Sequence, residues 1–510
     1  MKNSAFKYLL FSVLLLFMVN CSINKNRGTE KNGANRNGDN LKTEKFVDPS
    51  KVGFNLFEDA PSETKWVDSI YSNLSLEEKI GQLFMVAAYS NRDTVHFNAL
   101  SKLIKNQKIG GLIFFQGGPV RQAKLTNRFQ SEAKIPLFIG NDAEWGLSMR
   151  LDSTYRYPWN MTLGAIQDMK LIEDLGTQMG KETKRLGIQF NFAPVIDINT
   201  NPNNPIIGNR SFGENKEEVT KRAVSLMKGF QNQGVFSTGK HFPGHGDSET
   251  DSHHSLPTIN FSKDRIDDIE FYPYKKMFNL GLASVMVAHL NVPSLEERPN
   301  YPSSISYNIV TNILKKQLGF TGLIFTDALN MKGASNFKKP GEIDLEAFLA
   351  GNDILLFPED VPTAIEKFKQ AYTDTLVTEG RLEYSVKKIL KYKYKSGLNT
   401  FKPIETATLS SDLNKPISNS LQYKLYENAI TVLKNTDSIL PIQNLAKSKI
   451  AYVKLGDDTE RTFVSTLQKY TEITEVYHEN IDSLNLQLKK YNTVILGFHK
   501  SDKAWKKHTF

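Results

Sequence analysis

Short apolar segments alternate with amphipathic segments from about residue 80 to residue 400, and this repeat restricts the fold more than any other feature of the sequence. Segments with the length and composition of strands are residues 82–89, 110–115, 136–141, 189–198, 236–241, 284–290, 322–326 and 353–357. Helical patterns separate them, among others at residues 95–107, 121–133, 168–186, 216–232, 307–318 and 364–372. Eight strand-and-helix units predict an α/β protein with a (β/α)8 TIM-like barrel over residues 62–400.

Polar or charged residues stand at the ends of five predicted strands. In chain order they are Asp142, Asp197, the pair Lys240 and His241, His289, and Asp327. The carboxyl ends of barrel strands meet at one mouth, where the active sites of this fold lie. An aspartate after a strand can also simply cap the next helix, and such a local role stays open for Asp197 and His289. Because five strand ends share the feature, we expect a functional site at the mouth.

The segment that closes the fifth predicted strand and follows it is dense in ionisable side chains. It contains Lys240, His241, His245, Asp247, Glu249, Asp251, His253 and His254. In one interpretation, Asp251 orients the ring of His253 for proton transfer near neutral pH. In a second, a divalent metal such as zinc is bound by His241, His245, Asp247 and His253. In the third, the segment is a polar surface loop whose histidines only form hydrogen bonds.

The first 21 residues resemble the signal of a bacterial lipoprotein. Lys2 and Lys7 precede an apolar run that is too short to span a membrane, and Cys21 follows it as the single cysteine of the chain. This order predicts lipidation at Cys21 and a location in the bacterial cell envelope, lipid-anchored or periplasmic, with the membrane as a partner. An ordinary signal peptide or a simple anchor is the alternative.

Composition narrows the classes of partner. With one cysteine, the exported body is expected to contain no disulfide. Of the net charge of +9, residues 1–20, 22–51 and 500–510 carry +2, +3 and +3, so the body is nearly neutral. This distribution argues against nucleic-acid binding. Residues 22–61 are rich in Asn, Lys and Gly, which predicts a flexible tether.

Several segments carry a resemblance to a known enzyme family. They are residues 240–247 followed by Asp251-Ser252-His253, residues 74–82, residues 209–213 and residues 325–327. Over about residues 65–400 they resemble, in the same order, bacterial β-N-acetylglucosaminidases of glycoside hydrolase family 3. The resemblance implies a retaining enzyme that removes terminal β-linked N-acetylglucosamine from peptidoglycan fragments or related glycosides, with no metal and no other cofactor.

Carried over position by position, the resemblance implies a role for eight residues. Asp327 is the implied nucleophile, and His253, supported by Asp251, the implied general acid/base. The implied sugar-binding residues are Asp142, Arg150, Arg210, Lys240 and His241. The residue types suit these roles, because nearby cations keep an aspartate ionised and an imidazole exchanges protons near neutral pH.

Alternatives remain at this stage. Where the family often has Glu-Gly-Gly-Arg, this chain has Glu144-Trp145-Gly146-Leu147, and Trp145 either stacks on a sugar or packs the loop as a buried aromatic. A β-glucosidase or β-xylosidase of the same family is the second enzyme hypothesis, and a catalytically inactive envelope lipoprotein that binds sugar is the non-enzymatic one. A further hypothesis is that phosphate replaces water as the acceptor, since a neutral histidine would not repel it.

After the barrel, the sequence predicts a linker over residues 401–427 and the start of an α/β second domain over residues 428–510. Residues 428–435 resemble the beginning of the second domain of many family 3 enzymes. Strand-like runs at residues 449–455, 474–478 and 491–498, with helical stretches between them, predict a small parallel sheet. The domain is expected to be partial or truncated.

Overall fold

The computed structural model describes residues 59–456 and 461–499. The predicted signal, the lipidation site Cys21 and nearly all of the predicted tether lie outside these residues. Within the described ranges, no helix combines the length and the apolar character that crossing a membrane requires. The described residues form a large barrel and a small sheet.

Eight parallel strands form the barrel. They are β1 (Phe84–Ala88), β2 (Gly111–Phe114), β3 (Phe138–Asn141), β4 (Phe190–Asn191), β5 (Phe236–Phe242), β6 (Ser284–Val287), β7 (Leu323–Thr326) and β8 (Leu355–Leu356). Their order in the sheet is β7-β6-β5-β4-β3-β2-β1-β8. A parallel bridge between Phe325 and Ile354 joins the two ends. The predicted (β/α)8 barrel is therefore confirmed.

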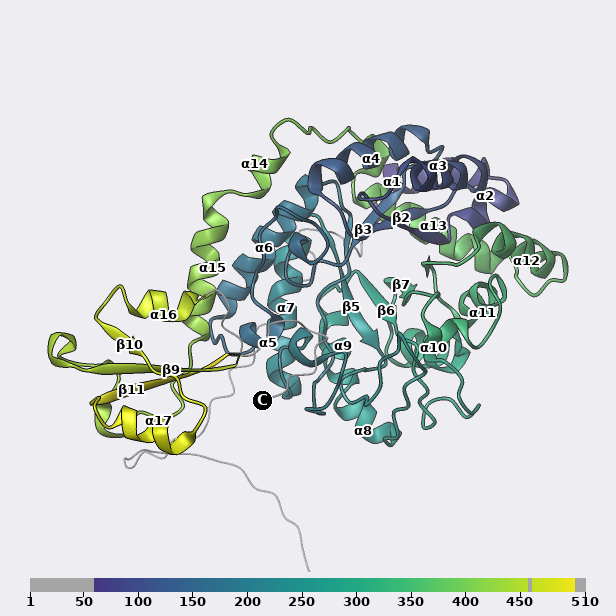
Figure 1. Cartoon of the computed structure of the whole chain (residues 1–510). Helices are drawn as coiled ribbons and strands as arrows, with labels where there is room; N and C mark the ends of the chain where they lie inside the picture. The colour runs from purple at the N-terminus through teal and green to yellow at the C-terminus, as the bar shows by residue number, and fades with distance from the viewer. Residues whose placement is uncertain (1–58, 457–460, 500–510) are drawn as a thin grey trace, which may run out of the picture. The chain divides into compact units, whose positions relative to one another are not determined.

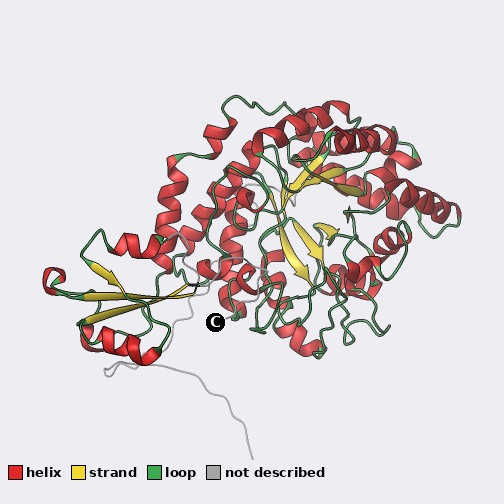
Figure 2. Ribbon diagram, in the orientation of Figure 1, coloured by secondary structure: helices red, strands yellow, loops and turns green. Residues whose placement is uncertain are grey.

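Helices surround the strands, as Figures 1 and 2 show. The α-helices of this part are α1 (Pro61–Ser72), α2 (Leu76–Gly81), α3 (Thr94–Lys102), α4 (Pro119–Glu132), α5 (Asn160–Leu163), α6 (Met169–Arg185), α7 (Lys216–Asn232), α8 (Lys263–Asp268), α9 (Phe271–Phe278), α10 (Lys332–Ser335), α11 (Glu342–Ala350), α12 (Val361–Thr373) and α13 (Glu379–Lys395). Two π-helices span Leu103–Gln107 and Asn308–Gln317. Local sequence fixes helix starts: at α2, Ser75 and Glu78 form a reciprocal capping box.

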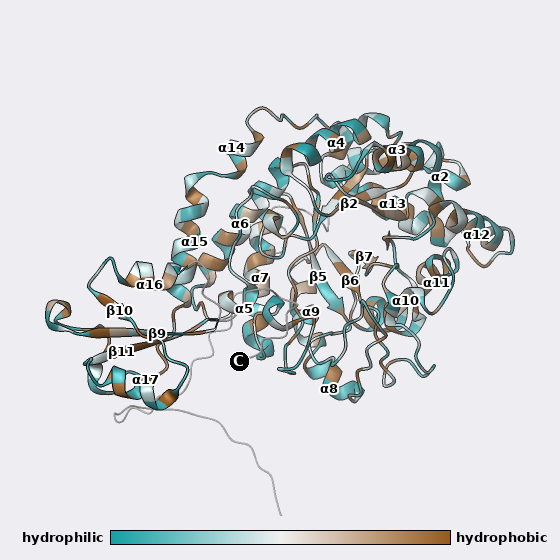
Figure 3. Ribbon diagram, in the orientation of Figure 1, coloured by the Kyte–Doolittle hydropathy of each residue, from teal (hydrophilic) through white to brown (hydrophobic). Residues whose placement is uncertain are grey.

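The interior of the barrel is filled by aromatic side chains. The ring of Phe190 lies 4.9 Å from that of Phe138 and 5.0 Å from those of Phe236 and Phe325, measured between centroids. All four side chains are buried, and burying one such ring stabilises a fold by about 1.5–3 kcal/mol. In Figure 3 much of strands β2 and β6 is brown (hydrophobic), strand β5 is partly teal (hydrophilic), and the outer helices carry many teal residues. The packed interior leaves the mouth as the place for a site.

Strand β4 is much shorter than the predicted segment 189–198. The N–H of Phe192 still donates to the carbonyl of Asn141 in β3, but the N–H of Ala193 turns back to the carbonyl of Asn191 and Pro194 has no N–H, so regular pairing stops here. The chain nevertheless stays beside β5, because the N–H of Ile196 donates to the carbonyl of Lys240 at 2.9 Å. This contact places Asp197 at the mouth next to the end of β5.

Helices that the sequence analysis did not identify complete the barrel part. Helix α13 packs against α1, and its Tyr392 donates to the carbonyl of Ala283 at 2.9 Å. The segment predicted as a linker, residues 401–427, contains α14 (Leu409–Leu413) and most of α15 (Pro416–Ala429). Leu421 and Leu425 of α15 are buried in the apolar cluster that also holds residues of α6 and α7. Part of this segment is therefore packed structure.

The small sheet has three parallel strands in the order β10-β9-β11. They are β9 (Ile450–Gly456), β10 (Ile473–Glu475) and β11 (Thr493–His499), with helices α16 (Thr462–Leu467) and α17 (Ile481–Leu488) between them. Alternation along β9 separates two apolar clusters, with Ile450 and Tyr452 in one and Ala451 and Val453 in the other. The predicted small parallel sheet is confirmed.

Candidate active site

A cavity of about 1470 Å³ opens at the carboxyl ends of the barrel strands. Its walls include all eight residues to which the sequence assigns a catalytic or sugar-binding role: Asp142, Arg150, Arg210, Lys240, His241, Asp251, His253 and Asp327. Glu144, His245 and several methionines also line it. The fold thus brings together residues from the ends of β3, β5 and β7 and from the loops after β4 and β5.

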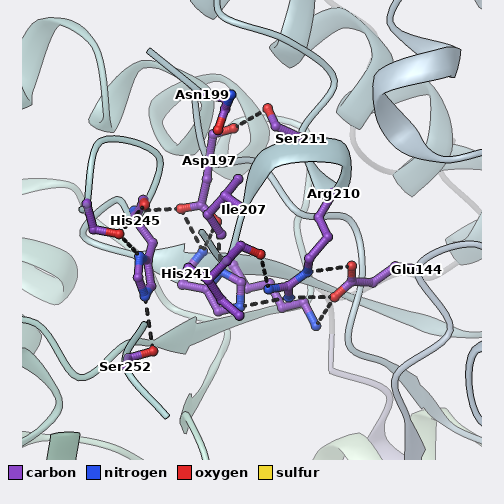
Figure 4. Close-up of polar contacts among 12 residues, drawn as sticks. Glu144, Asp197, Asn199, Ile207, Arg210, Ser211, His241, His245 and Ser252 are labelled. Atoms are coloured by element: carbon purple, nitrogen blue, oxygen red, sulfur yellow. Dashed lines mark hydrogen bonds and ion pairs between the residues drawn. The ribbon is translucent and has the colours of Figure 1, made fainter. Parts of the chain in front are cut away.

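A buried network of ion pairs forms the inner wall. Asp142 accepts from the guanidinium of Arg150 at 2.6 Å and from Nζ of Lys240 at 2.9 Å. Glu144 also pairs with Lys240 at 2.9 Å, and its two oxygens accept from Arg210 at 2.9 and 2.7 Å. Figure 4 shows the two-pronged contact between Glu144 and Arg210. Each buried charge therefore has an opposite charge beside it, as burial requires.

The network keeps its carboxylates ionised. Burial alone would raise the pKa of Asp142, but Lys240 and Arg150 hold that pKa well below its usual range. Burial likewise opposes ionisation of Glu144, yet Arg210 and Lys240 lower its pKa to about 2. At neutral pH the wall therefore presents fixed carboxylate acceptors beside fixed ammonium and guanidinium donors. Such a set suits the hydroxyl groups of a sugar.

A bulge in β5 turns two successive side chains toward the cavity. Lys240 pairs with Met286 of β6 and Phe242 pairs with the next residue, Val287, so His241 is the extra residue. In a regular strand, neighbouring side chains point to opposite faces, whereas a bulge re-aims one of them. Lys240 and His241 consequently both line the cavity.

Asp197 is not the helix cap that the sequence left open. Its side chain is buried, and it accepts from Nδ1 of His241 at 2.7 Å and from the backbone N–H of His245 at 2.7 Å (Figure 4). With Asp197 accepting at Nδ1, Nε2 of His241 is free to accept from Arg210, which lies at 3.3 Å. Asp197 therefore fixes the orientation of a cavity-lining imidazole.

Asp327 follows β7 and is fixed by its backbone. Its N–H donates to the carbonyl of Val287, and its carboxylate accepts from the N–H of Ala328, both at 2.8 Å. Burial raises the pKa of Asp327, but His241, His289 and His253 lower it below its usual value. The group is thus an ionised carboxylate aimed into a cavity, as a nucleophile requires.

Asp251 and His253 form a hydrogen-bonded pair on the loop after β5. Oδ1 of Asp251 lies 2.7 Å from Nδ1 of His253. The side chain of His253 is 54% exposed, in contrast to the inner wall. The hydrogen bond that His253 donates to Asp251 raises the pKa of His253 despite burial, and the charge of Asp327 adds to this effect. The imidazole is therefore protonated more readily than a free histidine.

The remaining alternatives can be compared with these contacts. His289 does not cap a helix: its Nδ1 lies 2.7 Å from Oγ of Ser304, and its Nε2 lies 3.0 Å from the carbonyl of Ala328, the residue after Asp327. Trp145 is the buried aromatic: it is almost inaccessible, and its ring packs 4.1 Å from that of Trp159.

The four side chains of the metal interpretation do not form one ligand group. Asp247 contacts Arg265 at 3.2 Å, and His245 lies between Ser248 and Ser252. No group of three or more His, Cys, Asp or Glu side chains in the described ranges has the arrangement of a metal site.

The profile of the glycosyl hydrolase family 3 N-terminal domain matches residues 75–392, which is more than half of the chain. The chain belongs to glycoside hydrolase family 3. A curated relative, Beta-hexosaminidase A from Pseudoalteromonas piscicida, is 35% identical over 380 residues, covering 68% of this chain. The match spans 63% of the length of that relative.

Two further proteins are similar over more of their length. A protein from Cellulomonas fimi named Beta-N-acetylglucosaminidase/beta-glucosidase is 26% identical over 405 residues, 78% of this chain and 71% of that protein. The structure of a family 3 β-N-acetylglucosaminidase from Paenibacillus sp. str. FPU-7 superimposes with a TM-score of 0.71 and 29% identity, covering 83% of this chain and 84% of that one.

Sequence reasoning missed several residues of this site. Glu144 stands two positions after Asp142, and that spacing at a strand end was a usable signal because alternate residues share a face. The contacts of Asp197, His245 and Ser252 join separate strand ends and loops. No pattern along the sequence predicts these contacts.

Proposed function

We propose that this protein is a retaining exo-β-N-acetylglucosaminidase that removes terminal β-linked N-acetylglucosamine from peptidoglycan fragments or related glycosides. The observation that carries the proposal is that Asp327 and the Asp251–His253 pair line one cavity together with the inner ionic wall. The names of the relatives from Pseudoalteromonas piscicida and Paenibacillus sp. support the choice of amino sugar.

In the first step, the carboxylate of Asp327 attacks the anomeric carbon. The bond between that carbon and the leaving oxygen breaks, and protonated His253 gives its proton to this oxygen. A covalent glycosyl-aspartate forms, and His253 is left neutral. Asp251 favours the protonated ring before the step and keeps Nδ1 directed toward itself, so that Nε2 is the nitrogen that gives the proton.

In the second step, neutral His253 takes a proton from water as the water oxygen attacks the anomeric carbon. The bond to Asp327 breaks, the carboxylate is restored, and the sugar leaves with its original β configuration. His253 ends protonated and Asp327 ionised, as they began. The lowered pKa of Asp327 and the raised pKa of His253 both favour this resting pair of states.

In this proposal the sugar is held by Asp142, Arg150, Arg210, Lys240 and His241. Their mutual hydrogen bonds fix the side chains before substrate binds, so little orientational freedom is lost on binding. A glucosidase is the second candidate, because the relative from Cellulomonas fimi carries both activities in its name.

We also propose that the enzyme is attached to the bacterial cell envelope through Cys21. The support is the sequence alone: two lysines, a short apolar run and then the cysteine. Incorporation of labelled palmitate in the producing cell, compared with a Cys21→Ser variant, tests it. Equal labelling of both proteins contradicts the proposal.

The activity is tested by release of chromophore from aryl β-N-acetylglucosaminide and aryl β-glucoside, side by side. The wild type is compared with Asp327→Ala and His253→Ala. The proposal predicts preference for the amino sugar and impaired turnover in both variants. Preference for the glucoside moves the protein to the second candidate, and wild-type-like turnover by Asp327→Ala overturns the residue assignment.

A further inference from the structure

Ser252 stands between Asp251 and His253 but lies in a different environment. Its side chain is buried, whereas that of His253 is largely exposed. Oγ of Ser252 lies 3.1 Å from Nε2 of the buried His245, as Figure 4 shows. Ser252 is therefore a buried hydroxyl next to the exposed residues 253–255, and it marks a point at which this part of the loop is attached to the barrel.

Both ring nitrogens of His245 are paired with hydroxyl groups. Nδ1 lies 2.7 Å from Oγ of Ser248, and Nε2 lies 3.1 Å from Oγ of Ser252. In a neutral imidazole one nitrogen donates and the other accepts, and a hydroxyl can do either, so both contacts are hydrogen bonds in either tautomer. Burial lowers the pKa of His245 to about 4, so the ring is neutral near neutral pH.

His245 is itself held on the barrel. Its N–H donates to Asp197 at 2.7 Å, and its carbonyl accepts from Asn204 at 2.8 Å. A chain of hydrogen bonds therefore runs from His241 through Asp197 and the backbone of His245 to Ser252 (Figure 4). It connects a cavity-lining residue of β5 to the middle of the loop.

A second contact joins Ser252 to the short helix that follows strand β7 and Asp327. Its carbonyl accepts from the N–H of Gly333 at 3.2 Å, and Gly333 lies on α10, six residues after Asp327. A Cβ atom at Gly333 would lie 3.1 Å from that carbonyl oxygen, so the close approach depends on glycine. Ser252 is thereby fixed from both the β5 side and the β7 side of the cavity.

We propose that Ser252 is a positioning residue for proton transfer, and that its hydrogen bond to His245 determines where His253 stands relative to the sugar. Ser252 does not touch the reacting atoms; it acts through its neighbour in the loop. The inference rests on the proposed function, since it takes His253 as the general acid/base. It goes further by naming the structure that holds this exposed residue in place.

The test compares kcat/KM for a series of aryl β-N-acetylglucosaminides, from dinitrophenyl to unsubstituted phenyl, in wild type and Ser252→Ala. A poor leaving group needs the proton and a good one does not, so misplacing His253 lowers kcat/KM selectively. We expect a loss of about 10- to 100-fold on the phenyl glycoside and a loss within about 3-fold on the dinitrophenyl glycoside. An equal loss on every substrate overturns the inference.

A double variant separates positioning from general damage. If Ser252 acts only through His253, then Ser252→Ala/His253→Ala matches His253→Ala within about 2-fold on the phenyl glycoside. If the loss of kcat/KM in the double variant instead equals the product of the losses in the two single variants, the inference is overturned and the proposed function stays intact. If His253→Ala itself shows no dependence on the leaving group, the acid/base assignment fails, and the inference fails with it.

Two matched variants complete the design. Ser255→Ala changes the same residue type three positions on, where the side chain is exposed, and is expected to change kcat/KM by less than about 2-fold. Ser252→Thr keeps the hydroxyl and is expected to restore the leaving-group dependence of the wild type. A Ser252→Thr variant as selective in its loss as Ser252→Ala contradicts the role of the hydrogen bond.

Discussion

Two regions that face the same cavity are built differently: the inner wall of ion pairs, and the loop after β5 that carries Asp251 and His253. The side chains of Glu144 and Lys240 on the wall are 0% and 3% exposed and are joined by several ion pairs. On the loop, the His253 side chain is 54% exposed and has one carboxylate partner. The wall follows directly from the ends of β3 and β5, whereas the loop extends beyond β5.

The difference in burial matches two tasks of the proposed mechanism, which are holding the sugar and transferring a proton. Holding a sugar requires fixed donors and acceptors, and buried ion pairs at strand ends supply them. Transferring a proton twice requires a group whose charge can change, and burial among fixed charges would prevent that. In the proposed mechanism the group whose charge changes is His253 on the exposed loop, and we infer that Ser252 limits its movement. The predictions below test this division.

The largest effect is expected at the nucleophile. Asp327→Ala removes the carboxylate that bonds to the sugar, and kcat should fall by about 10⁴-fold for every leaving group. Steady-state rates on aryl glycosides measure it, with thermal unfolding as the check that the variant is folded. A loss below about 10-fold would exclude Asp327 from a covalent step.

On the loop, His253→Ala should lower kcat/KM by about 10²- to 10³-fold on a phenyl glycoside, because general acid catalysis is lost. The dinitrophenyl glycoside should still form the glycosyl-enzyme intermediate, but its hydrolysis should be slow because no base activates the water. Azide attacks without a base, so adding it should raise kcat and yield the β-glycosyl azide. The product is identified by NMR, and Asp327→Ala should not give this β product.

On the wall, Glu144→Gln should cost about 3 kcal/mol of the free energy of unfolding, because Arg210 and Lys240 lose a shared buried partner. Urea denaturation measures the change. The matched control is Asp152→Ala, which breaks an exposed pair with Arg121 and should cost less than about 1 kcal/mol. If both variants lose the same free energy of unfolding, the buried ion pairs of the wall stabilise the fold no more than an exposed pair does.

The smallest effect is a shift along the pH axis. His253 must be protonated to act as an acid, so kcat/KM falls as pH rises through its pKa. The hydrogen bond that His253 donates to the Asp251 carboxylate raises that pKa, hence Asp251→Asn should move the basic limb of the profile to lower pH. The acid limb, set by ionisation of Asp327, should stay in place. An unmoved basic limb would mean that another group sets it.

The barrel and the positions around its mouth could be predicted because both leave local traces in the sequence. Apolar runs of strand length mark the sheet, and charged residues such as Asp142 and Asp327 stand at strand ends. The specific motif around Lys240 and His253 then gave the family, which the profile match confirms. Placement of these side chains in one cavity follows from the fold.

What could not be predicted depends on contacts between distant segments. The role of Asp197 requires the end of β4 to lie beside β5, and the role of Ser252 requires burial against His245 and Gly333. The early end of β4 follows from the missing N–H of Pro194, which the apolar pattern concealed. Most of helix α15 falls in the segment predicted as a linker, where three of its residues, Ser418, Leu421 and Leu425, are buried.

The central claim is that Asp327 forms a covalent bond to the sugar, and mass spectrometry can test it directly. The wild type is incubated with a 5-fluoro-N-acetylglucosaminyl fluoride, which slows the second step, and is then digested. We expect one added fluorosugar on the peptide that contains Asp327. Label on a different residue, or an active enzyme that releases the α anomer first without any label, would contradict it.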